Sequence, residues 1–170
     1  MKNFTTNEVY WTLLNHAQWN MYIAATKEGL CYIGSPNAPL EELMTWVKKR
    51  IPGYILTEES GLLQPYKLEL IDYLEGRRRE FSLRMDLHGT PFQLLVWNAL
   101  LEIPYGQTVS YSEIAERIQK PKSVRAVGTA IGANPVLMTV PCHRIIAKNG
   151  QLGGFRAGLE MKEQLLQLEK

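Results

Sequence analysis

The 170-residue sequence predicts an α+β protein built from two domains. The first half alternates strand-like and helix-like segments, which predicts a small α/β domain with a mixed or antiparallel sheet over residues 1–87. The second half, residues 88–170, contains two short helical segments joined by a tight break, which predicts a mostly helical domain with a helix-turn-helix. With 45% hydrophobic and 21% charged residues, the composition is ordinary for a globular protein.

The first half provides the predicted sheet. Segments rich in β-branched and aromatic residues predict three strands, at residues 9–14, 21–26 and 29–34. The last two flank a Lys-Glu-Gly turn and are expected to form a hairpin. Cys31 lies inside this hairpin between apolar neighbours, so we interpret it as a packing residue. Residues 81–87 alternate apolar and polar side chains, which predicts one more strand.

Two segments of the first half have apolar residues at helical spacing, residues 39–51 and 66–77. We find no phosphate-binding loop and no paired carboxylates in this half. We therefore expect it to support the second half rather than to carry chemistry.

The second half begins with residues that start helices. Thr90 suits an N-cap and Pro91 the first helical position, in a helix that continues to Leu100. Ser110 and Glu113 have the spacing of a capping box, at the start of a short helix that ends at Lys120-Pro121. The next short helix spans residues 123–131, with Gly132 at its C-terminal end.

Charge is distributed unevenly although the net charge is only +2. The stretch from Arg117 to Arg156 contains no acidic residue and seven basic ones: Arg117, Lys120, Lys122, Arg125, Arg144, Lys148 and Arg156. Such a segment is a candidate surface for a polyanion, or a solvated face whose acidic partners come from elsewhere in the fold. The second short helix is lined with small residues, which fits either a close approach to a DNA minor groove or tight packing on a neighbouring helix.

The second short helix leads directly to a cysteine. Gly132 to Pro135 predicts a turn, which the Asn134 side chain can tie to the segment that follows. Residues 136–140 are apolar and predict a buried strand that runs into Pro141-Cys142. About ten residues therefore separate the helix from the cysteine.

Cys142 has the surroundings of a reactive thiol. His143 and Arg144 follow it, and neighbouring positive charge lowers a thiol pKa. The N-terminus has no apolar signal segment, so we expect a reducing cytoplasm in which Cys31 and Cys142 are free thiols. The chain has only three histidines and no Cys-x-x-Cys pair, which argues against a structural zinc site. No apolar run is long enough for a membrane span.

The chain closes with a glycine-rich loop and a helix. Residues 153–158 place Phe155 and Arg156 in a flexible loop, which either lines a pocket for a flat ligand or serves only as a connection. An amphipathic helix over residues 159–168 follows and ends in Glu169.

Together these residues resemble the O6-alkylguanine-DNA alkyltransferases, also called methylated-DNA–protein-cysteine methyltransferases. The motif Pro141-Cys142-His143-Arg144, preceded by Asn134-Pro135, resembles their active site. The resemblance is nearly continuous from about residue 88 to 169 and includes Gly89-Thr90-Pro91-Phe92-Gln93, Val96-Trp97, Ile103-Pro104-Tyr105-Gly106, Ser110-Tyr111, Ile114-Ala115, Arg125-Ala126-Val127-Gly128, Gly153-Gly154-Phe155, Lys162-Glu163 and Leu165-Leu166. The first half matches only in general character.

The resemblance implies a ribonuclease H-like first domain, a winged helix-turn-helix-like second domain and a protein that works as a monomer without a cofactor or metal. Its partner would be double-stranded DNA that contains an alkylated guanine, bound through the minor groove with the damaged base flipped out. Arg125 would fill the vacated stack, with Ala126 and Gly128 on the helix in the groove. Tyr111 would lie near the flipped base and donate its hydroxyl to it.

The implied chemistry is a direct displacement on the alkyl carbon by Cys142. His143 would act as base through a water, oriented by Glu169, and Asn134 would hold the turn. Backbone groups around Cys142, Ile145 and the loop of Phe155 and Arg156 would read the guanine edge. Phe155 stands where the family often has Tyr, and Arg156 where a small residue is common. Since neighbouring strand residues point to opposite faces, a water between Cys142 and His143 is sensible.

The product would be a thioether. No residue in the chain resembles a group that could cleave it, so each chain would react once. Three other functions are open to such a sequence: a lesion-binding module without chemistry, a transcriptional regulator and a cysteine hydrolase. Cys142 argues against the first, and the small number of cysteines against a regulator with a cysteine-rich metal-binding segment. A hydrolase would need an oxyanion hole and a base in contact with the thiol, and we identify neither.

Overall fold

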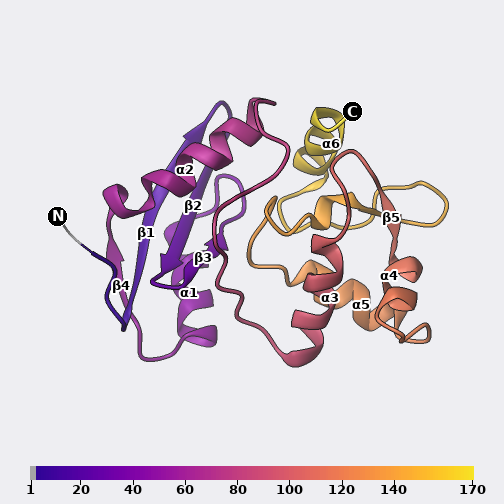
Figure 1. The fold of residues 1–170 in the computed structure, drawn as a ribbon, viewed down its shortest axis with the longest axis horizontal. Helices are drawn as coiled ribbons and strands as arrows, with labels where there is room; N and C mark the ends of the chain where they lie inside the picture. Colours follow the sequence, from indigo (N-terminus) through magenta and orange to yellow (C-terminus); the bar gives the residue numbers. More distant parts are fainter. Residues whose placement is uncertain (1–2) are drawn as a thin grey trace. The chain divides into compact units, whose positions relative to one another are not determined.

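A computed structural model describes residues 3–170 of the chain, which forms two compact units. One unit ends at His88, and the other spans Gly89–Lys170. The predicted α+β class is confirmed, with a sheet in the first unit and mainly helices in the second (Figure 1). Within residues 3–170, no helix combines the length and the apolar character needed to cross a membrane.

The N-terminal unit contains a mixed four-stranded sheet with the strand order β3-β2-β1-β4. Strands β1 to β3 form an antiparallel meander, and β4 joins parallel to β1. The bounds of the four strands are Glu8–His16, Trp19–Thr26, Gly29–Ile33 and Ile55–Glu58. The three predicted strands and the hairpin at residues 27–29 are therefore confirmed.

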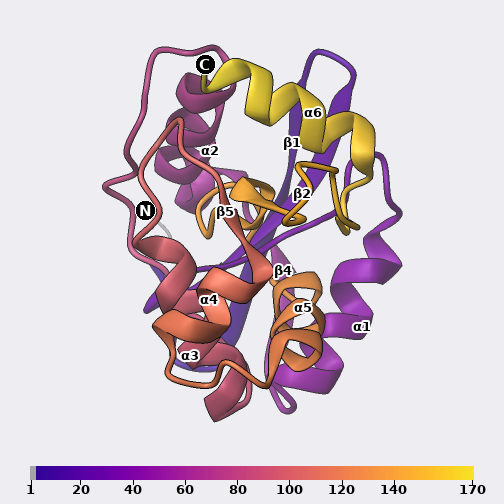
Figure 2. The ribbon, with the colours of Figure 1, turned by 90° about the vertical axis from the view of Figure 1, so that its right-hand side faces the viewer.

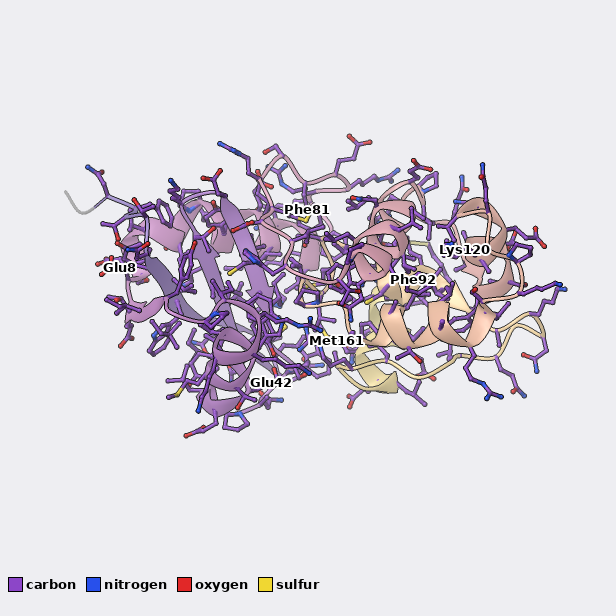
Figure 3. The ribbon with its side chains drawn as sticks, turned by 90° about the horizontal axis from the view of Figure 1, so that it is seen from below. Glu8, Glu42, Phe81, Phe92, Lys120 and Met161 are labelled. Carbon is purple, nitrogen blue, oxygen red and sulfur yellow. The ribbon has the colours of Figure 1, made fainter. Side chains whose placement is uncertain are left out.

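Two helices, α1 (Leu40–Arg50) and α2 (Ser60–Leu74), flank this sheet (Figure 1). Helix α1 packs its Leu43 and Val47 against a buried cluster that contains Cys31, as expected for a packing cysteine. Alternate residues of β1 point to the other face of the sheet, where α2 contacts this strand. Glu42 of α1, labelled in Figure 3, accepts hydrogen bonds from Tyr32 and from the Ser35 backbone.

The prediction of a helix at residues 66–77 was wrong at both ends. Helix α2 begins at Ser60 and includes Pro65, which removes one helical hydrogen bond but leaves the buried face of Leu63 and Leu70 in place. It ends at Leu74 because Gly76 adopts a φ of 77° and closes a Schellman turn, in which the Arg77 amide donates to the Asp72 carbonyl at 2.8 Å.

Strand β4 was not predicted, and the strand predicted at residues 81–87 does not form. Ile55 is 61% exposed, and β4 exists because β1 offers its backbone as a partner. In the 81–87 segment only Met85 makes an isolated bridge, with Leu30. The Glu69 carboxylate accepts hydrogen bonds from the amides of Ser82 and Leu83, and only the Arg84 carbonyl and the Asp86 amide bond to Leu30 of β3.

The C-terminal unit groups three helices that contact one another, α3, α4 and α5, and places α6 apart from them (Figure 2). A short parallel pair, β5 with β6, and the 3₁₀ turn η1 lie between (Figure 2). Lys120, labelled in Figure 3, marks the break between α4 and α5. The bounds are Pro91–Leu101 (α3), Val109–Ser110 (β5), Tyr111–Arg117 (α4), Val124–Gly132 (α5), Cys142–Arg144 (η1), Ile145–Ile146 (β6) and Leu159–Leu168 (α6).

The predicted N-cap at Thr90 and the predicted capping box at Ser110 are both confirmed, and Thr90 forms a capping box as well. The Thr90 hydroxyl accepts from the Gln93 amide at 3.1 Å, and the Gln93 side chain accepts from the Thr90 amide at 2.9 Å. Ser110 and Glu113 make the same reciprocal pair at the start of α4. Helix α3 is fixed to α5 by buried Trp97, whose indole donates to the Ala130 carbonyl at 2.8 Å.

The strand predicted at residues 136–140 is wrong, although the segment is buried. Its backbone turns back on itself, with the Val140 amide donating to the Val136 carbonyl at 3.1 Å and Met138 at a φ of 69°. The Asn134 side chain favours this turn because it satisfies both the Val136 amide and the Val140 carbonyl. The chain therefore enters Cys142 from a turn, not from a strand.

We predict that Thr90→Ala lowers the free energy of unfolding by about 1 kcal/mol, because the Gln93 amide in the first turn of α3 loses its hydrogen-bond acceptor. Urea unfolding followed by circular dichroism measures the change. Thr108→Ala is the matched control, because Thr108 is exposed. Equal stability of the two variants would contradict the assigned role of the cap.

Candidate active site

Cys142 begins the 3₁₀ turn η1 and is 4% exposed. The expected strand geometry at this position was wrong. A 3₁₀ turn has three residues per turn, so successive side chains point about 120° apart rather than to opposite faces. Cys142 and His143 are thus directed into different surroundings, and each has its own hydrogen-bond partner.

The partner of Cys142 is Asn134, a fully buried residue. Its Nδ2 donates to Cys142 Sγ at 3.1 Å and to the Val140 carbonyl at 2.9 Å. Its Oδ1 accepts from the Val136 amide at 2.9 Å. The predicted tie of Asn134 to the following segment is therefore present, and the same side chain also contacts the sulfur.

The side chains of His143 and Arg144 both contact Glu169, the residue that directly follows α6. The distance between His143 Nε2 and Glu169 Oε1 is 2.9 Å. Arg144 donates from Nη2 to Oε1 at 2.7 Å and from Nε to Oε2 at 2.9 Å, while its Nη1 donates to the Ile103 carbonyl at 2.6 Å. The Tyr105 ring lies beneath the guanidinium, with its centre 5.7 Å from Arg144 Cζ. All three charged or polar groups of this cluster are buried.

This cluster determines how His143 is protonated. The Glu169 carboxylate is ionised because it pairs with the Arg144 guanidinium, and an ionised carboxylate can only accept hydrogen bonds. In the contact between His143 and Glu169, the hydrogen is therefore on His143 Nε2. Burial lowers the pKa of His143, although Glu169 acts in the opposite direction. The imidazole is therefore held neutral, with Nδ1 as the nitrogen that can take up a proton.

The expectation that His143 and Arg144 lower the pKa of the Cys142 thiol was wrong. Burial raises that pKa, because a thiolate loses its hydration in the interior. The Arg144 charge is compensated by Glu169, and the neutral His143 carries none. The groups that act in favour of the thiolate are the Asn134 amide and the charges of Arg156 and Lys162.

Tyr111, the first residue of α4, lies between two glycines. A Cβ at Gly128 of α5 would be 3.7 Å from its ring, and a Cβ at Gly153 would overlap its hydroxyl oxygen. Burial and the neighbouring charge of Cys142 both raise the pKa of Tyr111. The structure thus brings Tyr111, Gly128 and the 153–158 loop together near the cysteine.

Arg125 and Ala126 lie on the exposed face of α5, where they line a groove with Lys122 and Thr129 of the same region and with Phe92 of α3. Gly128 belongs to the inner side of the same helix, against Tyr111. The outer face of α5 therefore carries Arg125 and Ala126, and its inner face carries the small residue Gly128.

The remaining predicted residues lie around the turn η1. Ile145 is fully buried and pairs with Val109 between β5 and β6. Phe155 and Arg156 are half-buried, and Arg156 Nη2 donates to the Pro135 carbonyl at 3.4 Å. This contact joins the glycine-rich loop to the turn that carries Asn134.

Two features of the site were missed from the sequence. Arg144 was expected to act on the thiol but instead pairs with Glu169. Lys162 is only 1% exposed, beneath the 153–158 loop. The signal for Lys162 was present, because its spacing from Leu165 places it on the buried face of α6.

Across residues 3–170, no group of three or more histidine, cysteine, aspartate or glutamate residues is arranged to hold a metal ion. What the cluster offers is a buried thiol, a neutral imidazole backed by a carboxylate, and an adjacent tyrosine hydroxyl. Such a set suits nucleophilic attack by sulfur with removal of its proton by a nearby base.

Comparison with known proteins points to one family. The profile described as "6-O-methylguanine DNA methyltransferase, DNA binding domain" matches residues 91–170, and the profile of the ribonuclease-like domain of the same methyltransferase matches residues 9–87. The inducible methylated-DNA–protein-cysteine methyltransferase of Bacillus subtilis is 59% identical over 95% of this chain and 90% of its own length. The methylated-DNA–protein-cysteine methyltransferase of Methanosarcina acetivorans is 37% identical over 95% of this chain and 98% of its own.

Two solved structures are also similar to this chain. The crystal structure of Mycobacterium tuberculosis OGT in complex with DNA superposes with a TM-score of 0.81 and 36% identity, covering 95% of this chain and 92% of that one. The crystal structure of the O6-methylguanine methyltransferase of the same organism gives a TM-score of 0.82, also at 36% identity, over 95% of this chain and 93% of that one.

We predict that Glu169→Gln lowers the free energy of unfolding by about 3–5 kcal/mol, because the buried Arg144 guanidinium loses its counter-charge. Glu163→Gln on the exposed side of α6 is the matched control and should change stability by less than about 0.5 kcal/mol. Urea unfolding of both variants measures the difference. A loss in Glu169→Gln no larger than in the control would show that the cluster is not held by this charge.

Proposed function

The chain belongs to the 6-O-methylguanine DNA methyltransferase family, and from this we propose that it repairs alkylated DNA by direct reversal. It moves a methyl or other alkyl group from O6 of guanine in duplex DNA to the sulfur of Cys142. The observation that carries this proposal is the buried arrangement of Cys142 with Asn134, beside a neutral His143 backed by Glu169. It supplies a nucleophile and a base without a metal or cofactor.

The DNA duplex is bound through its minor groove by α5, and the damaged guanine is flipped out of the stack. The exposed face with Arg125 and Ala126 supports this role, because it combines a cation with a small side chain on a slim helix. Arg125 fills the space that the flipped base leaves. The N-terminal unit supports this domain, and no DNA contact is assigned to it.

The flipped guanine lies between Tyr111 and the loop of residues 153–158. Backbone groups at Cys142, Ile145 and the loop read the edge of the base. Phe155 contributes a ring contact. The close seating of Tyr111 on Gly153 supports a pocket in which the phenol hydroxyl faces the base.

The transfer is a direct displacement. The thiol proton of Cys142 passes through a water to Nδ1 of His143, since Nε2 faces Glu169. The sulfur then forms a bond to the alkyl carbon as the bond from that carbon to O6 breaks. The guanine keeps the electron pair and takes a proton from the Tyr111 hydroxyl, which is replenished from solvent.

The product is a thioether on Cys142, a bond too stable for the groups of this site to reverse. Each chain therefore reacts once, as a monomer. It acts in the cytoplasm, a reducing compartment that fits its two free thiols.

A DNA oligomer that carries O6-methylguanine with a labelled methyl group tests this function. We predict that the label appears on the Cys142 peptide at about one methyl per chain and that Cys142→Ala abolishes the transfer. Cys31→Ala is the matched control, because it removes the other buried thiol and should keep one transfer per chain. Label on another residue, or more than one transfer per chain, would refute the proposal.

We predict that Gly153→Ala slows methyl transfer by about 100-fold, because the added methyl group displaces the Tyr111 hydroxyl from the base. Gly154→Ala is the matched control, since a Cβ there would have no neighbour within 4 Å. Single-turnover rates on the methylated oligomer measure both. Equal rates in the two variants would remove Tyr111 from the proposed mechanism.

A further inference from the structure

The loop of residues 103–106, between α3 and β5, takes no direct part in the proposed transfer. It passes beside the C-terminal end of α6 (Figure 1, Figure 2). The Ile103 carbonyl accepts a hydrogen bond from Arg144 Nη1 at 2.6 Å, and the Tyr105 hydroxyl donates to the Leu168 carbonyl at 3.1 Å. The loop therefore contacts both the arginine that pairs with Glu169 and the helix end that carries Glu169.

Tyr105 contacts both of these partners with one side chain. The centre of its ring is 5.7 Å from Arg144 Cζ, and its hydroxyl reaches the last turn of α6, where a helix leaves carbonyls without partners of its own. The ring and the hydroxyl thus fix the guanidinium and the helix end relative to each other.

Gly106 lies closer to Glu169 than a residue with a side chain could. It adopts a φ of 81°, and a Cβ would be 2.9 Å from the Glu169 carbonyl oxygen. Its amide is also directed at Glu169 Oε2, at 3.5 Å. This position requires glycine both for its backbone conformation and for the space that Glu169 occupies.

These contacts matter because Glu169 follows the last residue of α6, and helix ends fray unless other parts of the fold hold them. The carboxylate lies 2.9 Å from His143 Nε2 and determines which ring nitrogen carries the hydrogen. A shift of about 1 Å in such a group can slow a reaction by about 100-fold. The end of α6 must therefore be held in place for His143 to act as the base.

We propose that Tyr105 and Gly106 are positioning residues for the transfer. Through the end of α6 they hold the Glu169 carboxylate against His143 Nε2, so that Nδ1 is presented to the water that receives the Cys142 proton. The inference rests on the proposed function, of which this proton relay is a part. Neither residue touches the reacting atoms, and both act through Glu169.

Tyr105→Phe removes the hydroxyl and keeps the ring beneath the guanidinium. We expect the single-turnover rate at a saturating concentration of the O6-methylguanine oligomer to fall about ten-fold, with the affinity for the oligomer unchanged. Tyr54→Phe is the matched control, because Tyr54 is 36% exposed in the N-terminal unit, and this variant should keep the full rate.

Gly106→Ala tests the same contact from the backbone. Gly53→Ala is its matched control, because Gly53 has a φ of 89° but a Cβ there would have no neighbour within 4 Å. Alanine therefore causes similar backbone strain at both positions and a clash with Glu169 only at position 106. We expect the transfer rate to fall about 100-fold in Gly106→Ala and to stay unchanged in the folded Gly53→Ala protein.

Nitrogen NMR of the His143 ring, measured without DNA, separates positioning from a purely structural role. In the unchanged protein the hydrogen on Nε2 should give clearly different signals for Nε2 and Nδ1, assigned by their loss in His143→Gln. In Tyr105→Phe the two signals should move toward each other, because part of the population exchanges the hydrogen between the nitrogens. Circular dichroism checks that each variant is folded.

The proposal requires both changes in folded Tyr105→Phe, the slower transfer and the altered His143 signals. An unchanged rate or unchanged His143 signals would each overturn it, even if the variant were less stable. Failure of the unchanged protein to transfer any methyl group would instead refute the proposed function. The His143 signals alone would then decide whether Tyr105 positions the imidazole through Glu169.

Discussion

The carboxylate of Glu169 receives hydrogen bonds from both His143 and Arg144, and the C-terminal unit depends on this buried contact. It joins the residue that follows α6 to the turn η1, although the two lie far apart in the sequence. The same guanidinium reaches the Ile103 carbonyl just after α3. One charge pair therefore holds the ends of several elements around the cysteine and fixes the orientation of the imidazole.

A second buried contact, made by Asn134, determines where the sulfur lies. Its amide satisfies the backbone of the turn after α5 and also donates to Cys142 Sγ. A hydrogen bond to sulfur favours the thiolate, whereas burial disfavours it. Burial thus favours the protonated thiol, while the Asn134 amide partly offsets this effect.

Small residues allow helix α5 and the 153–158 loop to pack against one tyrosine. Tyr111 packs against Gly128 of α5 on one side and against Gly153 on the other. A side chain at Gly153 would occupy the place of the hydroxyl, so this position depends on glycine for space and not for backbone conformation. The positions of α5 and of the 153–158 loop are therefore linked through a single ring.

Elements whose signals are local were predictable from the residues alone. Thr90 is the N-cap that its residue type predicted, Ser110 and Glu113 form the capping box that their spacing predicted, and the hairpin of the first sheet lies where its turn residues placed it. The motif around Cys142 identified the family, because its residue types are ordered along the chain. The C-terminal end of α2 was also encoded locally, in Gly76, but the apolar spacing alone did not reveal it.

Features that depend on distant partners became visible only in the folded chain. Strand β4 exists because β1 pairs with it, and the 81–87 segment makes only an isolated bridge to Leu30 while Glu69 binds its Ser82 and Leu83 amides. Burial reversed the expected effect on the Cys142 thiol, since the pKa of a group depends on hydration and on charges that the chain brings near from elsewhere. Arg144, two residues after the cysteine, is directed to Glu169, whereas Lys162, twenty residues beyond the cysteine, is buried against the Gly153 carbonyl.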